Sequence, residues 1–219
     1  MLFLKKKNVC EPSFEIISES SSFQLREAYN ALCTNLFHIS IEDKCKKIAV
    51  CSASYGEGKD SVAINLAISL AENLRDSKVL LLDFDMRTSC VSEFIKGKLE
   101  VSDCADIEVD DITVNKTDIS NLDISVCKTP IINPASLICS EETALFFAKC
   151  EERYDYVIIN TAPVTEFSDT LLLTSRVNGC LLVARKKHST VKMLDKAEAA
   201  LKSTGTEIFG IVLTDNKIK

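Results

Sequence analysis

Apolar positions along the chain follow two patterns that alternate from one end to the other. After Ser61, apolar residues recur at helical intervals, which predicts a helix with a buried face. A continuous apolar run over 78–84 predicts instead a strand that is buried on both faces. Strands that alternate with helices predict an α/β fold, with a parallel sheet at its core and helices on both faces. The other predicted strands are 47–53, 156–161, 179–185 and 208–213, and the other predicted helices are 23–37, 134–150 and 189–203.

The rest of the chain shows no linker and no repeat that would indicate a second domain. Residues 1–22, which end in a serine-rich stretch, are expected to form an N-terminal extension, and residues 23–219 a single domain. The polar segment 95–120 is expected to be an irregular peripheral insertion. No apolar run approaches the roughly 18 residues of a membrane span, and the start lacks the apolar core of a signal peptide. We therefore expect a cytoplasmic protein without direct membrane insertion.

Composition and charge narrow the class of protein further. With 46% hydrophobic and 26% charged residues, the chain is typical of a globular fold and not of a disordered one. A formal charge of −6 and a pI near 5.1 argue against nucleic acid as a partner. The ten cysteines lack the spacing of a zinc knuckle. Those in apolar runs, such as Cys51 and Cys180, indicate reduced core thiols, with a metal or disulfide role as the alternative.

A glycine-containing loop between the first predicted strand and its helix has the spacing of a phosphate-binding P-loop. Its glycines allow backbone N–H groups to face phosphates, and the helix N-terminus adds partial positive charge. Lys59 is placed to reach the outer phosphates. Asp60 stands where a Ser or Thr hydroxyl normally ligates Mg²⁺. The predicted ATP- or ADP-binding residues are Ser54, Tyr55, Gly56, Glu57, Gly58, Lys59, Asp60 and Ser61.

Two further strands end in polar residues that belong to the same predicted site. Asp83 and Asp85 follow a buried run, and ligands of open α/β sheets bind beyond such carboxyl ends. Asn160, a neutral amide, ends a later strand where a second metal-organising carboxylate would be expected. We predict catalytic roles for Lys59, Asp83 and Asp85. The predicted Mg²⁺ ligands are Asp60, Asp83, Asp85 and Asn160.

These motifs together resemble the bacterial tyrosine kinases that govern capsule and exopolysaccharide synthesis. The family pattern has a loop S-A-x-P-G-E-G-K-S/T, a strand ending D-x-D-x-R, and Y-D-Y/F-V-I-I-D-T-P-P. This chain has SASYGEGKD, LLLDFDMR and YDYVIINTAP in the same order, and the resemblance covers roughly residues 23–215. It implies a P-loop NTPase fold of the deviant-Walker, MinD-like group.

The resemblance also implies partners and an activity. It implies ATP with Mg²⁺, autophosphorylation of a C-terminal tyrosine cluster in a neighbouring subunit, and ring assembly. It further implies activation by a membrane-anchored partner of the polysaccharide co-polymerase type, which would recruit the chain to the inner face of the cell membrane. Asn30 and Cys33, however, stand where the family carries two arginines for the subunit contact, which disfavours a ring. No tyrosine follows Tyr156, so we expect no phosphoacceptor in a tail.

The departures at Asp60 and Asn160 leave two interpretations of the metal site. A carboxylate about 4 Å from a phosphate oxygen costs roughly 4 kcal/mol at an effective dielectric constant near 20, unless a cation neutralises it. A carboxylate that binds Mg²⁺ is favourable instead. Asn160 removes one carboxylate while Asp60 adds one, so the site has either decayed or relocated a metal ligand.

Three functions follow, in order of preference. The first is a tyrosine-kinase-like ATP-binding regulator of capsular or exopolysaccharide biosynthesis, with impaired phosphotransfer. The second is a non-catalytic, nucleotide-responsive subunit of the polysaccharide export machinery. The third is a partition ATPase, which is disfavoured because such proteins carry a signature lysine where this loop has Ser54.

Overall fold

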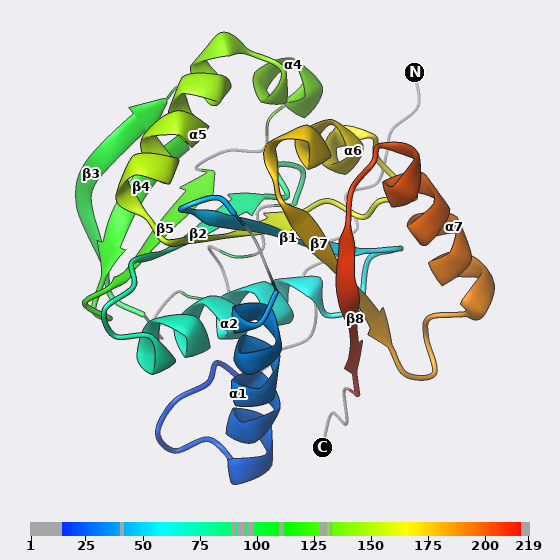
Figure 1. The fold of residues 1–219 in the computed structure, drawn as a ribbon, viewed down its shortest axis with the longest axis horizontal. Coiled ribbons are helices and arrows are strands. Elements are labelled where there is room, and N and C mark those ends of the chain that lie inside the picture. Colours follow the sequence, from blue (N-terminus) through cyan, green and yellow to red (C-terminus); the bar gives the residue numbers. More distant parts are fainter. Residues whose placement is uncertain are drawn as a thin grey trace.

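The computed structural model describes residues 15–39, 42–88, 91, 95, 99–109, 112–127, 131 and 133–215, with the backbone alone for 102–109, 126 and 127. Strands and helices alternate along most of the chain (Figure 1). The strands are β1 (Lys46–Ser52), β2 (Val79–Phe84), β3 (Val101–Val109), β4 (Ile112–Thr117), β5 (Leu122–Cys127), β6 (Tyr156–Thr161), β7 (Gly179–Arg185) and β8 (Ile208–Thr214). The helices are α1 (Phe23–Phe37), α2 (Lys59–Asn73), α4 (Pro134–Ile138), α5 (Glu141–Arg153), α6 (Asp169–Leu173), the 3₁₀ turn η1 (Thr174–Arg176) and α7 (Val191–Ser203).

The strands form one eight-stranded sheet in the order β3-β4-β5-β2-β6-β1-β7-β8. Neighbouring strands from β5 to β8 in this order are parallel, as expected for the five strands that the sequence predicts. The strand β5 is an addition, because the sequence analysis predicted no strand at 122–127. The prediction of an irregular insertion at 95–120 is wrong, because β3 and β4 pair antiparallel and extend the sheet beyond β5. This hairpin escaped detection because β4 has only two apolar residues, Ile112 and Val114, followed by three polar ones, which is too short a pattern to indicate a strand.

Helices cover both faces of the sheet, and side chains along each strand alternate between them. On the face of α1 and α2, Ile48 and Val50 of β1 join a core that includes Leu66 of α2. On the opposite face, Ala49 and Cys51 pack with residues of α7. Helices α4, α5 and α6 lie over the same opposite face, nearer β2 and β6 (Figure 1). The strands are therefore buried on both sides, which explains their continuous apolar runs.

Side-chain caps set the helix boundaries. The predicted helix 134–150 is wrong as a single element, because the chain breaks at Cys139 and restarts. Asn133 accepts a hydrogen bond from Ser136 N at the start of α4, and the hydroxyl of Ser140 accepts one from Thr143 N at the start of α5. A second N-cap within an apolar stretch therefore divides it into two helices.

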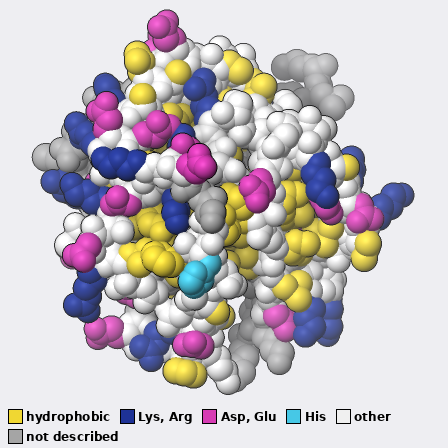
Figure 2. Space-filling model, in the orientation of Figure 1, with side chains coloured by type: hydrophobic (Ala, Val, Ile, Leu, Met, Phe, Trp, Pro, Cys, Tyr) yellow, Lys and Arg dark blue, Asp and Glu magenta, His cyan; other side chains and the backbone are white. Residues whose placement is uncertain are grey.

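Residues before α1 contact the core. Ile17 is buried, and its backbone N–H donates a hydrogen bond of 2.8 Å to Oδ1 of Asn65 in α2. The Nδ2 of Asn65 in turn donates to the carbonyl of Glu15. Within the described ranges, no helix is both long and apolar enough to span a membrane. On the face shown in Figure 2, basic and acidic side chains are interspersed around a central area where apolar side chains are visible.

Candidate functional site

The loop between β1 and α2 is shaped by two glycines in the left-handed region. Gly56 has φ 83° and Gly58, the N-cap of α2, has φ 90°. A side chain at Gly58 would also approach Thr214 at 3.2 Å, so both the backbone and the space favour glycine there. All eight residues predicted to bind phosphate lie in this loop or in the first turn of α2.

Groups from distant parts of the chain hold the loop in place. The hydroxyl of Thr214 donates to the carbonyl of Glu57 at 2.8 Å, and Nη1 of Arg185 donates to the carbonyl of Gly56 at 3.0 Å. The carboxylate of Glu57 is buried, where it accepts a hydrogen bond from Ser54 N at 2.8 Å and another from the hydroxyl of Ser189. These contacts shape the loop before any phosphate binds.

One backbone donor of the loop is taken by a carboxylate from the other side of the site. Tyr55 N donates to Oε1 of Glu166 at 3.3 Å. The ring of Tyr55 packs edge-on against Phe167, with 6.2 Å between ring centroids, and Lys59 Nζ lies 5.8 Å from the centre of the tyrosine ring. Arg87 forms a two-point ion pair with Asp169, at 2.6 and 3.1 Å. The segment between β6 and α6 therefore closes over the loop.

At the start of α2, Lys59 is folded back onto two carboxylates. Its ammonium lies 2.7 Å from Oδ1 of Asp60 and 2.7 Å from Oδ2 of Asp85. All three side chains are almost wholly inaccessible to solvent. The two carboxylates raise the pKa of Lys59 although burial opposes this, so the ammonium stays charged.

Asn160 joins the ends of three elements. Its Nδ2 donates to Oδ1 of Asp60 at 2.8 Å and to Oδ1 of Asp83 at 3.0 Å. An aspartate at this position would provide no such donor and would add a further negative charge. Asn160 therefore makes the juxtaposition of Asp60 and Asp83 tolerable in a buried site.

Negative charge still exceeds positive charge around Lys59. Burial first, and the nearby carboxylate of Asp85 second, raise the pKa of Asp83 to about 7. On the carboxylate and amide side chains of this cluster, three buried acceptor oxygens have no hydrogen-bond partner: Oδ2 of Asp83, Oδ1 of Asp85 and Oδ1 of Asn160. Unpartnered buried acceptors are costly, which indicates a site built to receive a cation or a donor.

The donor set fits the chemistry of Mg²⁺, which prefers carboxylate and amide oxygens. It contains two carboxylate oxygens and one amide oxygen. Without the amide of Asn160, no group of three or more His, Cys, Asp or Glu side chains in the described ranges is arranged to hold a metal. The ammonium of Lys59 meanwhile contacts Asp60 and Asp85, two of the four predicted ligands.

Sequence reasoning brought Lys59, Asp60, Asp83, Asp85 and Asn160 to one site, and the structure places them in direct contact. It missed the groups that hold the loop from far along the chain: Glu166, Arg185, Ser189 and Thr214. The only hint in the sequence was that some of these residues lie in segments that resemble the kinase family. Such a resemblance identifies a position in the chain, but it does not predict which residues that position contacts.

The described cysteine side chains are unpaired thiols. Five are buried and only Cys139 is exposed. Burial raises the pKa of Cys33 to about 11, so this thiol stays protonated. The five buried thiols therefore behave as core residues.

Comparisons with known proteins agree with this geometry. The AAA domain family matches residues 45–177. The tyrosine-protein kinase CpsD of Streptococcus pneumoniae is 30% identical over 207 residues, which cover 92% of this chain and 89% of CpsD. The kinase domain of the Escherichia coli tyrosine kinase ETK has the same fold, with a TM-score of 0.72 and 24% identity over 89% of this chain and 77% of that one.

A more distant structure shares the fold alone. The septum site-determining protein MinD of Pyrococcus horikoshii, solved with Mg-ADP, gives a TM-score of 0.58 at 20% identity, over 77% of this chain and 70% of MinD. The fold is thus that of P-loop NTPases of the MinD-like group. Within this class, the chain belongs to the family of bacterial capsule tyrosine-protein kinases.

Proposed function

We propose that this chain binds ATP or ADP at residues 54–61 and regulates capsular or exopolysaccharide biosynthesis, with impaired phosphotransfer. The observation that carries the proposal is the pair of ion contacts from Lys59 to Asp60 and Asp85. Asp60 replaces the hydroxyl of the family pattern, so the lysine that would reach the phosphates is held by a carboxylate that the family lacks. Nucleotide binding must break at least part of this buried network.

Asp60, Asp83, Asp85 and Asn160 are the residues that would hold Mg²⁺ in this proposal. The bound ion would neutralise phosphate oxygens of the nucleotide. Lys59 would then bind the outer phosphates, while Asp83 and Asp85 serve as the family's catalytic carboxylates. Asn160 positions Asp60 and Asp83 through its two hydrogen bonds.

The burial of the tyrosines supports impaired self-phosphorylation. Tyr29, Tyr154 and Tyr156 are each less than a tenth exposed. The hydroxyl of Tyr154 is also engaged, donating to Asp123 at 2.6 Å. A buried hydroxyl cannot enter the site of a neighbouring molecule without local unfolding. This also keeps the alternative of a non-catalytic, nucleotide-responsive subunit open.

We further propose that residues 23–219 act as one nucleotide-binding unit, with 1–22 as an extension, and that a ring does not form readily. At the positions of the missing arginines, Asn30 accepts a hydrogen bond from Asn73 at 2.8 Å, and Cys33 is buried. Neither offers a charge to a neighbour. The proposed partner is a membrane-anchored activator of the polysaccharide co-polymerase type, which would recruit this cytoplasmic chain to the membrane.

Isothermal titration with ATP and ADP, with and without Mg²⁺, tests the binding proposal. We expect measurable affinity for both nucleotides, and we expect the backbone amides of Gly56 and Gly58 to shift in NMR spectra. Lys59→Ala should weaken binding at least tenfold, whereas Lys192→Ala on the exposed face of α7 should leave it unchanged. Absence of binding at millimolar nucleotide, or shifts elsewhere than in the loop, would refute the proposal.

Mass spectrometry after incubation with ATP and Mg²⁺ tests the impairment of phosphotransfer. We expect little phosphotyrosine on the purified chain. Stoichiometric phosphate on Tyr29, Tyr154 or Tyr156 would contradict the proposed impairment while leaving nucleotide binding intact.

A further inference from the structure

A second polar cavity lies beyond the amino-terminal ends of the parallel strands. We call this side of the sheet its amino edge, and the side that carries the P-loop, beyond the carboxyl-terminal ends, its carboxyl edge. The cavity has a volume of about 660 Å³, within the range of about 300–1,000 Å³ typical of small-molecule sites. It is lined where β2, β5 and β6 begin and where α2 and α5 end. Because these strands are parallel and the P-loop follows the end of β1, the two sites lie at opposite edges. The ligand of one site therefore cannot contact the other.

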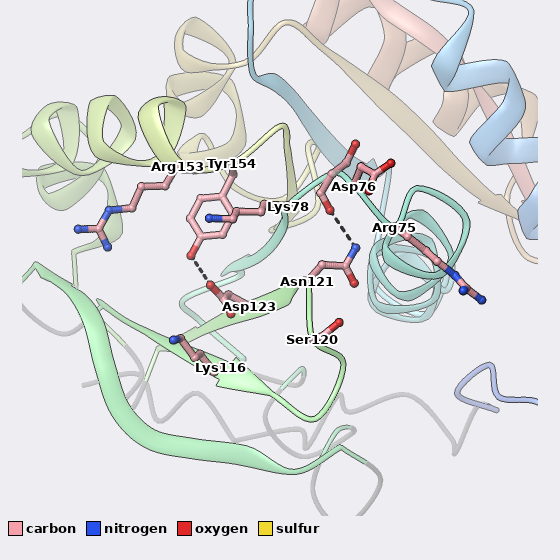
Figure 3. A pocket seen from close by; sticks show the side chains of 10 residues that line it. Arg75, Asp76, Lys78, Lys116, Ser120, Asn121, Asp123, Arg153 and Tyr154 are labelled. Atoms are coloured by element: carbon pink, nitrogen blue, oxygen red, sulfur yellow. Dashed lines mark hydrogen bonds between the residues drawn. The ribbon is translucent and has the colours of Figure 1, made fainter.

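The cavity gathers positive charge in an acidic protein. Four of its lining residues are cationic: Arg75, Lys78, Lys116 and Arg153. Two are acidic, so the lining carries a net positive charge although the chain as a whole has a formal charge of −6. Figure 3 shows the side chains of Lys78, Lys116 and Arg153 around the hydrogen bond between Tyr154 and Asp123, while Arg75 extends on the other side of Asn121. These cations come from separate parts of the chain that the fold brings together.

The floor of the cavity is rigid. The hydroxyl of Tyr154 donates to Oδ2 of Asp123 at 2.6 Å, and Tyr154 is buried. Nδ2 of Asn121 donates to the backbone carbonyl of Ala71 in the last turn of α2 and to those of Leu74 and Ser77 in the α2–β2 connection. The amide is thus fixed in orientation, and the connection that carries Lys78 is tied to the start of β5. Such preorganisation lowers the entropic cost of binding.

We propose that this cavity binds a small phosphorylated sugar. Lys78, Lys116 and Arg153 supply the charge and the N–H donors that a phosphate group requires. Asp123 and Asp76 supply acceptors for the hydroxyl groups of a sugar, which inorganic phosphate lacks. The two acidic side chains interrupt the basic lining, which favours a compact ligand with separate anionic and hydroxyl-bearing parts over nucleic acid.

The test compares glucose 1-phosphate with inorganic phosphate on the full chain. Both carry close to two negative charges at pH 8, so they differ chiefly in the sugar hydroxyls. Binding is followed by NMR through the backbone amides of Ser77, Ser120 and Asn121, with the amide of Gly58 as an independent reporter of the P-loop. We expect saturable shifts at the first three amides, with several-fold tighter binding of glucose 1-phosphate.

Variants assign the binding to the cations. The double change Lys78→Ala with Lys116→Ala should weaken binding of glucose 1-phosphate about tenfold, because it removes two cations roughly 5 Å from a dianion. The matched double change Lys192→Ala with Lys196→Ala, on exposed positions of α7, should leave affinity unchanged. Thermal melting of each variant confirms folding, which these exposed substitutions leave intact.

Three results would overturn the inference. The first is the absence of saturable shifts at the three amides, and the second is an equal loss of affinity in the two double variants. The third is equal affinity for the two probes, which would exclude the sugar. Shifts at Gly58 alone are one form of the first result: they would place the phosphate in the P-loop, which supports the proposed function while it overturns this inference.

Discussion

Charged residues cluster at both the carboxyl edge and the amino edge of the sheet, but they are buried at the first and exposed to solvent at the second. At the carboxyl edge, Lys59 and Asp85 are buried, and each charge has a partner at 2.7 Å. At the amino edge, Lys78 and Lys116 are exposed around an open cavity. Burial strengthens electrostatic interactions and raises the cost of any unpaired charge. A lysine is therefore expected to be essential for stability at the carboxyl edge and replaceable without loss of stability at the amino edge.

The largest effect is expected for Lys59→Met. The change leaves the buried carboxylates of Asp60, Asp83 and Asp85 without their cation, and removing one partner of a buried ion pair costs about 3–5 kcal/mol. Urea denaturation should show this loss in the free energy of unfolding. An equally stable variant would mean that the carboxylates take up protons without penalty or that solvent reaches them.

The coupling between Asp60 and Asn160 is expected to be the next largest effect. Because Asn160 donates directly to Asp60, the two substitutions Asp60→Ser and Asn160→Asp should be non-additive, with an interaction energy on the order of 0.5–3 kcal/mol. Affinity for Mg-ATP is to be measured for the four combinations. If Asp60 is a relocated ligand, Asp60→Ser alone weakens binding and the double change restores it.

The interpretation of a decayed site makes a different prediction. Asp60 then only repels phosphate, so Asp60→Ser alone tightens Mg-ATP binding whatever residue occupies position 160. Additive effects with this outcome would exclude relocation.

A pH effect of intermediate size is expected from Asp83, without nucleotide or metal. Its folded-state pKa of about 7 lies above the usual 3.8, so the folded protein holds the proton more tightly than the unfolded chain does. This stabilisation is complete below about pH 4 and is lost as pH rises through 7. Lowering the pH from 8 to 6 should therefore raise the free energy of unfolding through this group, by on the order of 1 kcal/mol.

The variant Asp83→Asn is the control for the pH effect. It removes the titrating carboxyl while keeping its shape, so its unfolding free energy should vary less between pH 6 and pH 8. Parallel pH profiles for the two proteins would show that Asp83 does not titrate in this range.

The smallest effect is expected for Lys78→Met, the matched change at the amino edge. An exposed lysine contributes little to stability, so the free energy of unfolding should change by less than about 0.5 kcal/mol. The same urea experiment as for Lys59→Met gives the comparison directly. A loss comparable to that of Lys59→Met would show that the two edges do not differ in the way described.

The sequence predicted the central strands to within about one residue because their apolar runs are continuous, as in Val79–Phe84. It missed β3, β4 and β5, whose apolar runs are short and interrupted by polar residues, and the five-residue helix α6. It also missed the cap at Ser140 inside an apolar stretch. In the site, motif spacing identified the residues that meet. It did not predict that Lys59 pairs with Asp60 and Asp85. Which buried carboxylates a lysine contacts depends on distances in the folded structure, and motif spacing does not give these distances.

The hydrogen bond from Thr214 to Glu57 has a consequence for the order of events during synthesis. The two residues are 157 positions apart, so the loop leaves the ribosome long before its partner in β8 does. At translation rates of about 5–20 residues per second, this interval lasts roughly 8–30 s. During this interval the P-loop of the nascent chain lacks β8, and therefore lacks the hydrogen bond from Thr214 to Glu57. A nascent chain stalled before β8 is therefore expected to bind nucleotide poorly.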